Sequence, residues 1–231
     1  MNIIPAINCQ NFECVSEKLK KAGDFFSQSG GWIQIDIADG KFTDWKTWNN
    51  PGELSDAKNQ LPDVNIEVHL MVEHPEEAID DWIKTGIQRI IVHFEAIKNS
   101  AAASENNSEA DILNLILDKC AAGGVEVGLA INPDTAIEEI LSYLDKIDMV
   151  QILAVNPGLS GQQFQAKVMK KIEFLKNVEL GYSDIVIEID GGINFELAQL
   201  AKEAGADIAA SASYIWNSLN PQEAFEKLNS I

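Results

Sequence analysis

The stretch from Ile185 to Asn194, IVIEIDGGIN, combines a carboxylate and two glycines at the end of an apolar run. A run of this length is typical of a strand buried on both faces of a parallel sheet, so Asp190 would lie at the carboxyl end of the strand, where α/β proteins carry their chemistry. Gly191 and Gly192 would leave backbone N–H groups free to hold a phosphate. The alternative is a tight turn in which Asp190 caps the next helix.

Two further apolar runs carry polar side chains that predict a shared site with Asp190. In WIQIDI, Gln34 and Asp36 alternate with bulky residues and therefore lie on one face of a strand, and NIEVHLMV contributes His69. A carboxylate inside a barrel is costly unless a metal, a cation or a substrate meets it. Two aspartates, a histidine and an amide oxygen could hold one divalent ion, with the histidine favouring Zn, Fe, Co or Mn over Ca. For His69 alone, the alternative is a hydrogen-bonded core histidine.

Such a cluster is suited to moving a proton next to a carbonyl group. A metal ion polarises the carbonyl oxygen and stabilises the enediolate that forms when the proton leaves. If Asp36 and Asp190 face opposite sides of this planar intermediate, one removes the proton and the other returns it from the far side. The expected outcome is inversion at one carbon.

Apolar runs and helical patterns alternate along the whole chain. The predicted strands are Ile3–Ile7, Trp32–Ile37, Asn65–Val72, Arg89–Phe94, Glu126–Ile131, Met149–Val155, the run that ends at Asp190, and Asp207–Ala210. The predicted helices are Phe12–Phe26, Pro75–Thr85, Asp111–Ala122, Ile137–Leu144, Lys167–Leu175, Phe195–Ala204 and Pro221–Leu228. Strict alternation over 231 residues predicts an α/β fold, the closed (β/α)8 TIM barrel, as a single domain over residues 1–231. The alternative is an open doubly wound sheet, but no GxGxxG motif follows the first strand.

Two segments between these elements are expected to be irregular. The long loop from Lys41 to Gly52 could cover the mouth of a site, and its Trp45 and Trp48 are expected to pack the loop more than to touch a substrate. The segment Ser100 to Glu109 is poor in large apolar residues and is predicted to be a flexible surface insertion. His93, at the end of the fourth predicted strand, is expected to be structural.

The composition restricts the classes of partner. With 36 acidic and 17 basic residues the net charge is −19, which argues against nucleic acid and anionic membranes as partners. Arg89 is the only arginine, so a phosphorylated ligand would be held mostly by backbone amides. No apolar run reaches the ~18 residues of a membrane span, and the first residues lack a basic secretory signal, which predicts a cytoplasmic protein. Cys9, Cys14 and Cys120 lack metal-type spacing and are expected to be free thiols.

Seven segments that run nearly from end to end resemble the ribulose-phosphate 3-epimerase family. They are Pro5–Ile7, Ile35–Gly40, Val68–Val72, Asn132–Pro133, Val155–Gly158 with Gly161–Gln162, Asp190–Ile193, and Gly205–Asp207 ahead of Ser213. Each is weak alone, but their order and spacing together are specific. The resemblance implies a (β/α)8 barrel and the interconversion of D-ribulose 5-phosphate and D-xylulose 5-phosphate, a reaction of the pentose phosphate pathway.

The resemblance also implies roles for individual residues. Asp36 would accept the proton, Asp190 would donate it, and both would bind one divalent ion together with His69. The phosphorylated sugar would contact His69 and a set of mostly backbone positions: Gly158, Leu159, Ser160, Gly161, Gly191, Gly192, Ala212 and Ser213. Because family members commonly form dimers or larger rings, a homo-oligomer is expected.

Several departures from the family pattern fall in the predicted site. Gln34 stands where the family has a histidine as fourth metal ligand, and an amide oxygen is a neutral, weaker ligand that makes Mn or Mg more plausible relative to Zn. Ala6 replaces a substrate-contacting serine. The other departures are Ala38 and Leu153 for methionines, Ser160 and Ala212 for glycines, and the segment Lys41–Trp45. They favour a divergent member, with two alternatives: a related isomerase or lyase on another phosphorylated sugar, or a non-catalytic barrel that binds a sugar phosphate.

Overall fold

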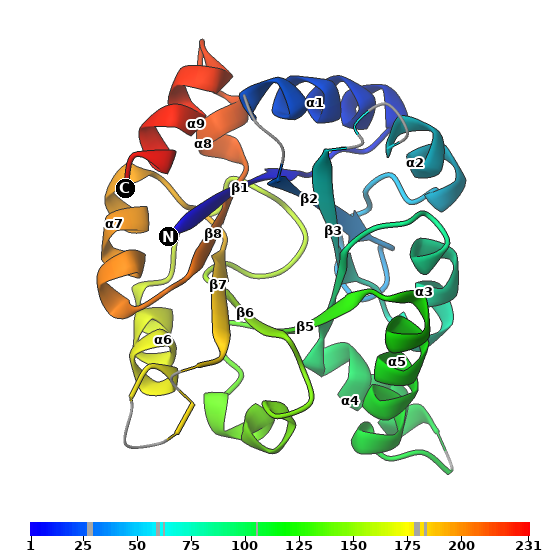
Figure 1. The fold of residues 1–231 in the computed structure, drawn as a ribbon. Helices are drawn as coiled ribbons and strands as arrows, with labels where there is room; N and C mark the ends of the chain where they lie inside the picture. The colour runs from blue at the N-terminus through cyan, green and yellow to red at the C-terminus, as the bar shows by residue number, and fades with distance from the viewer. Residues whose placement is uncertain (27–29, 59–60, 62, 105, 178–180, 183) are drawn as a thin grey trace.

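Eight parallel strands close into a barrel in sequence order, with β8 paired back to β1 and the helices outside (Figure 1). The structure is a computed structural model that describes residues 1–26, 30–58, 61, 63–104, 106–177, 181–182 and 184–231. The strands are β1 Asn2–Ile7, β2 Gly31–Ala38, β3 Val64–Met71, β4 Arg89–His93, β5 Glu126–Ile131, β6 Met149–Leu153, β7 Val186–Asp190 and β8 Ile208–Ser211. The predicted closed barrel is confirmed, and the open doubly wound sheet is excluded.

All seven predicted helical segments contain helix, with small changes of bounds. The helices are α1 Phe12–Phe25, α2 Pro51–Lys58, α3 Pro75–Ile83, α4 Phe94–Ala103, α5 Glu109–Gly123, α6 Met169–Leu175, α7 Phe195–Ala204, α8 Ser213–Trp216 and α9 Pro221–Asn229, together with the 3₁₀ segments η1 Ile137–Tyr143 and η2 Ala166–Val168. Helices α2, α4 and α8 were not predicted. The first two bury few large side chains, so they lack a strong apolar stripe.

The prediction of a flexible surface insertion at Ser100 to Glu109 is wrong at both ends of that segment, and residue 105 lies outside the described residues. Ser100 to Ala103 complete helix α4, and the Ser100 hydroxyl is buried against the backbone carbonyl of Glu73 at 3.2 Å. Ser108 then begins α5 with a capping box, because its side chain accepts from the Asp111 backbone N–H while the Asp111 carboxylate accepts in return. Small residues therefore form helix ends here instead of a loose loop.

The prediction of free thiols is correct for one cysteine and wrong for two. Cys120 is free and buried in α5, whereas Cys9 and Cys14 form a disulfide across the connection from β1 to α1. A spacing of five residues carried no metal or disulfide signature that could be read from the sequence alone. The turn that Asn11 makes as the N-cap of α1 brings the two sulfurs together.

The interior of the barrel is half apolar and half polar. One inward-facing cluster is apolar and consists of Ile4, Ile91, Ala130, Met149 and Ile208. Other inward positions carry polar side chains that are fully buried or nearly so, namely Gln34, Asp36, Glu67, His69, Arg89, His93, Gln151 and Glu188. Buried polar groups need partners, so these residues have to form a hydrogen-bonded network inside the barrel.

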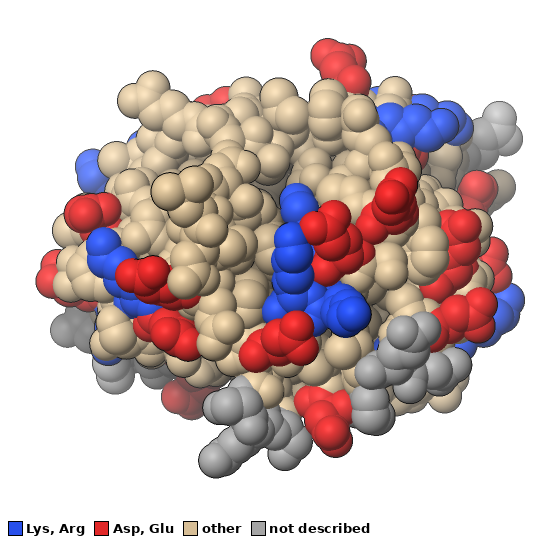
Figure 2. All heavy atoms as spheres, turned by 90° about the horizontal axis from the view of Figure 1, so that it is seen from above, with Lys and Arg blue, Asp and Glu red and all other residues tan. Residues whose placement is uncertain are grey.

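The outer surface carries both signs of charge. On the face in Figure 2, Lys and Arg side chains lie among Asp and Glu side chains and do not spread into a broad basic surface over the described residues. Within the described part of the chain, every helix is too short or too polar to cross a membrane.

Candidate functional site

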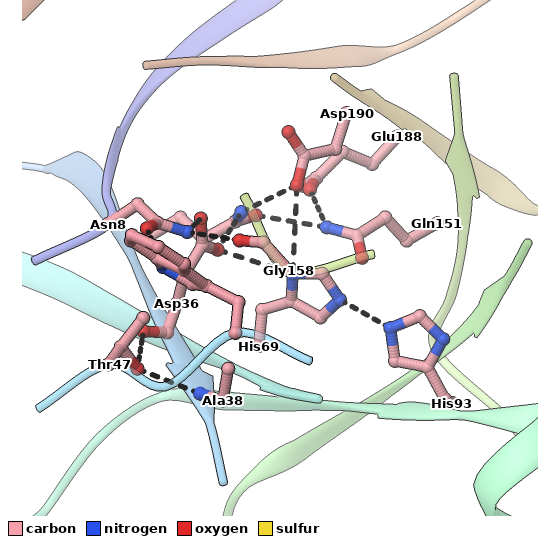
Figure 3. Close-up of polar contacts among 12 residues, drawn as sticks. Asn8, Asp36, Ala38, Thr47, His69, His93, Gln151, Gly158, Glu188 and Asp190 are labelled. Carbon is pink, nitrogen blue, oxygen red and sulfur yellow. Dashed lines mark hydrogen bonds and ion pairs between the residues drawn. The ribbon is translucent and has the colours of Figure 1, made fainter. Parts of the chain in front are cut away.

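Three ionisable side chains meet at the carboxyl ends of β2, β3 and β7. Asp36, His69 and Asp190 each offer a ligand atom, and these atoms all lie within 4.8 Å of one another (Figure 3). The His69 Nδ1 atom is 3.2 Å from Asp36 Oδ1 and 3.6 Å from Asp190 Oδ2. The predicted meeting of the two aspartates and the histidine is therefore confirmed, and this trio has the donor set of a divalent metal site.

These side chains line a small pocket at the mouth of the barrel. Its wall also contains every position predicted to contact a phosphorylated sugar: His69, Gly158, Leu159, Ser160, Gly161, Gly191, Gly192, Ala212 and Ser213. Most of them come from the loop after β6, the turn after β7 and the start of α8. Backbone groups thus make up much of the wall opposite the aspartates.

Two glycines in the turn after β7 let two backbone segments approach closely. Gly191 has φ +112°, and a Cβ there would lie 2.6 Å from the Val155 side chain. Gly192 has φ +68°, and a Cβ there would lie 3.1 Å from the Gln162 carbonyl oxygen. Both the backbone angles and the lack of space require glycine. Helix α7 is capped by Asn194, not by Asp190, so the alternative role of Asp190 as a helix cap is excluded.

The carboxylate of Asp36 is surrounded by N–H groups. Its Oδ1 atom accepts from the Gln34 amide nitrogen at 2.8 Å and lies 3.2 Å from His69 Nδ1. Its Oδ2 atom accepts from the Asn8 amide nitrogen at 3.2 Å. Asp36 is thus held in place by polar groups from three neighbouring parts of the barrel mouth.

The carboxyl group of Asp190 has a different environment. It accepts one hydrogen bond from the Gln34 amide nitrogen at 2.8 Å. Burial and the neighbouring charge of Asp36 raise the pKa of Asp190 to about 7, although His69 and Gln34 act in the opposite direction. Asp190 therefore carries its proton in much of the population near neutral pH, which suits a proton donor.

A chain of hydrogen bonds behind His69 holds its ring. The Nε2 atoms of His69 and His93 are 2.8 Å apart, and His93 Nδ1 lies 3.3 Å from Glu95 Oε2. Glu95 in turn accepts from the backbone N–H of Asn132 and the hydroxyl of Thr135. Burial lowers the pKa of His93, and for His69 the effect of burial is outweighed by the two aspartates, so its pKa is raised. His93 is thus structural, as predicted, and it turns His69 Nδ1 toward the aspartates.

Gln34 lies between the aspartates and a deeper amide. Its nitrogen donates to both Asp36 and Asp190, while its Oε1 atom accepts from the Gln151 amide nitrogen at 3.0 Å. In this orientation Gln34 turns N–H groups, not its oxygen, toward the trio. The ligand role predicted for Gln34 stays a prediction, and it requires the amide to turn over.

Sequence reasoning missed Asn8, which links three parts of the site. Besides Asp36, its amide nitrogen donates to the Gly158 carbonyl at 2.8 Å, and its oxygen accepts from the Trp45 indole at 3.1 Å. Asn8 is the first polar residue after β1, so the rule that found Asp36 and Asp190 could have found it. Trp48, in contrast, is buried and stacks on Phe12 with ring centroids 5.5 Å apart, as expected for packing.

Four substituted positions lie in strands, and one of them reaches the pocket. Leu153 lines the pocket together with Met71. Ala6 and Ala38 are completely buried in β1 and β2, and the Ala38 backbone N–H donates to the Thr47 hydroxyl at 2.8 Å.

The comparison with known proteins agrees with this site. Residues 2–216 match the model of the ribulose-phosphate 3 epimerase family. The chain is 39% identical over 218 residues to the ribulose-phosphate 3-epimerase of Chlamydia pneumoniae, covering 92% of this chain and 86% of that protein. It is 29% identical over 230 residues to the enzyme of the same name from Bacillus subtilis, covering 99% and 98%.

Solved structures agree on the fold. The 3-hexulose-6-phosphate synthase from Salmonella typhimurium superposes with a TM-score of 0.67 at 15% identity, covering 100% of this chain and 97% of that one. At that identity the likeness concerns the barrel alone. The match over nearly the whole sequence, together with the aspartates and histidine at the barrel mouth, means that this chain belongs to the ribulose-phosphate 3-epimerase family.

Proposed function

We propose that this protein interconverts D-ribulose 5-phosphate and D-xylulose 5-phosphate by proton transfer at C3. The observation that carries the proposal is the pair formed by Asp36 and Asp190, two carboxyl groups with different environments facing one pocket, in a chain of this family. Asp36 accepts hydrogen bonds from Gln34 and Asn8, and the raised pKa of Asp190, about 7, lets that group hold a proton near neutral pH. Such an unequal pair can act as base and acid in the same turnover.

In the forward direction Asp36 removes the proton from C3, and the electrons move into the C2 carbonyl to form an enediolate. Asp190 then delivers its proton to the opposite face of C3, and the roles reverse in the other direction. When a divalent ion such as Zn, Mn, Fe, Co or Mg is bound by Asp36, His69 and Asp190, it supplies positive charge that stabilises the enediolate. His69 is oriented for this by His93.

The phosphate is assigned to the backbone wall formed by Gly158–Gly161, Gly191–Gly192 and Ala212–Ser213. The single arginine supports this assignment indirectly, because Arg89 binds Glu67 and Glu126 at the amino-terminal end of the barrel. Backbone N–H groups then have to supply most of the recognition of the dianion. Association into a homo-oligomer stays a prediction.

The test is turnover of ribulose 5-phosphate in deuterated water by the purified protein supplied with Mn²⁺, Zn²⁺, Fe²⁺ or Mg²⁺. We expect deuterium at C3 of the product. Asp36→Asn and Asp190→Asn should each lower the rate by about 10²–10⁴-fold. Asp56→Asn, the same chemical change at an exposed position on α2, is the matched control.

Absence of deuterium uptake with every metal would refute the proposal. Uptake with a hexulose phosphate but not with ribulose 5-phosphate would instead assign a related isomerase activity. Binding of ribulose 5-phosphate that raises the melting temperature without exchange would identify a non-catalytic barrel.

A further inference from the structure

A chain of buried amides lies directly beneath the two aspartates. The Gln151 nitrogen donates to Glu188 Oε1 at 2.7 Å (Figure 3). It also donates to Gln34 Oε1 at 3.0 Å, and the Gln34 nitrogen donates onward to both aspartates. Gln34, Gln151 and Glu188 are completely buried. They come from β2, β6 and β7, so the chain connects strands on different sides of the barrel.

The partners determine which way each amide points. The Gln151 nitrogen lies between two oxygen acceptors, so a reversed Gln151 would bring its own oxygen against both of them. Its Oε1 atom has no hydrogen-bond partner among the described residues, and Gln151 is thus bound through its nitrogen. A reversed Gln34 would bring oxygen against the oxygens of Asp36 and Asp190 and nitrogen against the nitrogen of Gln151. In the observed direction the Gln34 and Gln151 nitrogens donate at every one of these contacts.

This direction opposes metal binding in two ways. The Gln34 N–H groups occupy lone pairs of Asp36 Oδ1 and Asp190 Oδ2, the oxygens that lie nearest His69. The Gln34 oxygen, which could serve as a ligand, is turned away and engaged by Gln151. A divalent ion has to share these two oxygens with the N–H donors of Gln34, and ligation by the Gln34 oxygen has to break its contact with Gln151.

We propose that Gln151 is a positioning residue that holds Gln34 as a hydrogen-bond donor to both aspartates and thereby weakens the affinity of the Asp36–His69–Asp190 trio for divalent ions. Glu188 supports Gln151 by accepting from the same nitrogen. The inference rests on the site used in the proposed function, but metal affinity measures it without any substrate.

The same donor affects a histidine introduced at position 34. An imidazole that accepts from Gln151 through one nitrogen has to carry its proton on the other, so it presents N–H to the aspartates and cannot bind a metal there. Gln34→His alone should therefore change metal affinity little. Removal of the Gln151 donor should allow the imidazole to become a ligand.

The test is calorimetric titration of the chelator-treated full chain with MnCl₂ and with ZnCl₂. Gln151→Leu should tighten binding several-fold, and Gln34→His combined with Gln151→Leu should tighten it about tenfold or more relative to Gln34→His alone. Gln34→Leu should abolish the effect of Gln151→Leu, because the amide that Gln151 controls is then gone. Gln151→Met, which also lacks a donor, repeats each comparison with a more adaptable side chain.

Met149→Leu is the control, since Met149 is equally buried on the same strand but lies in the apolar cluster. The inference would be overturned if Gln151→Leu left metal affinity unchanged both in the parent chain and in Gln34→His. It would also be overturned if Met149→Leu changed metal affinity as much as Gln151→Leu does. Because no substrate is present, a failed deuterium assay leaves this result intact and a failed titration leaves the proposed activity intact.

Discussion

Two pairs of carboxyl groups lie one above the other inside this barrel. Asp190 and Glu188 are two residues apart on β7 and share its inward face, and Asp36 and Glu67 belong to the paired strands β2 and β3. The upper pair, Asp36 and Asp190, opens onto the pocket and is surrounded by polar groups of Gln34, Asn8 and His69. The lower pair, Glu67 and Glu188, is completely buried.

The lower pair depends on one arginine. Arg89 donates to Glu67 Oε2 at 2.8 Å and to Glu126 Oε2, and it lies over the Trp32 ring at 4.2 Å. Burial raises the pKa of Glu67 even against the charge of Arg89, and burial together with the charge of Glu67 raises the pKa of Glu188 well above its usual range. In the proposed function the carboxyl groups at the mouth transfer protons, whereas the carboxyl groups one layer below are buried away from the pocket.

The largest expected effect is a loss of activity without loss of fold at the upper pair. Asp190→Asn should lower turnover by about 10²–10⁴-fold, since it removes the proton donor. It should leave the free energy of unfolding at neutral pH unchanged or higher, because a carboxyl group that is costly to ionise becomes an amide. Turnover and urea denaturation of the same preparation measure both. A strong loss of stability would remove the contrast between the two pairs.

The lower pair should show the opposite behaviour. Arg89→Met leaves Glu67 buried without its cation and should destabilise the fold by about 3–5 kcal/mol. The folded fraction should keep a turnover within about tenfold of the parent, since the residue lies away from the pocket mouth. Urea denaturation and activity below the unfolding transition measure this. Full stability in Arg89→Met would show that the lower carboxyl groups need no cation.

A smaller effect concerns the pH dependence of stability in the metal-free protein. Because the folded protein raises the pKa of Asp190 from 3.8 to about 7, it binds more protons than the unfolded chain within that window. The contribution of Asp190 is therefore fully present below the lower value and is lost as pH rises toward about 7. The stability of Asp190→Asn relative to the parent should increase by roughly 1–4 kcal/mol across the window. Urea denaturation of both proteins at a series of pH values measures this. If Asp190 ionised at its ordinary pKa, the difference in unfolding free energy between Asp190→Asn and the parent would not change with pH across the window.

The smallest effect is expected at Asn8. Asn8→Leu removes a donor to Asp36 and the link between Gly158 and Trp45, so kcat/KM should fall by about 3–30-fold. Trp45→Phe removes only the indole donor to Asn8 and should cost less. Steady-state kinetics of both variants test the order. A larger loss of kcat/KM in Trp45→Phe than in Asn8→Leu would show that the loop that carries Trp45 matters more for turnover than the hydrogen bonds of Asn8.

Much of the fold and of the site could be predicted because the signals are local. Alternating apolar runs and helical patterns indicated the closed barrel, and period-two spacing identified Gln34, Asp36 and His69 as inward-facing. Ser100 to Ala103 were predicted wrongly because a run of small residues looks alike in a loop and at the end of a helix such as α4. Gln151 was missed because one polar residue in an apolar run has no signature of its own.

The sequence by itself determined the barrel, the strand ends that carry the two aspartates and His69, and the glycines of the loops, because each follows from residue type and spacing within a few positions. Only the tertiary structure decided which way the Gln34 amide points, that Asn8 bonds to Asp36, and that His93 stands behind His69. These contacts join side chains from separate strands. A hydrogen bond depends on atomic distances and on the direction of donation, and no spacing along the chain encodes either.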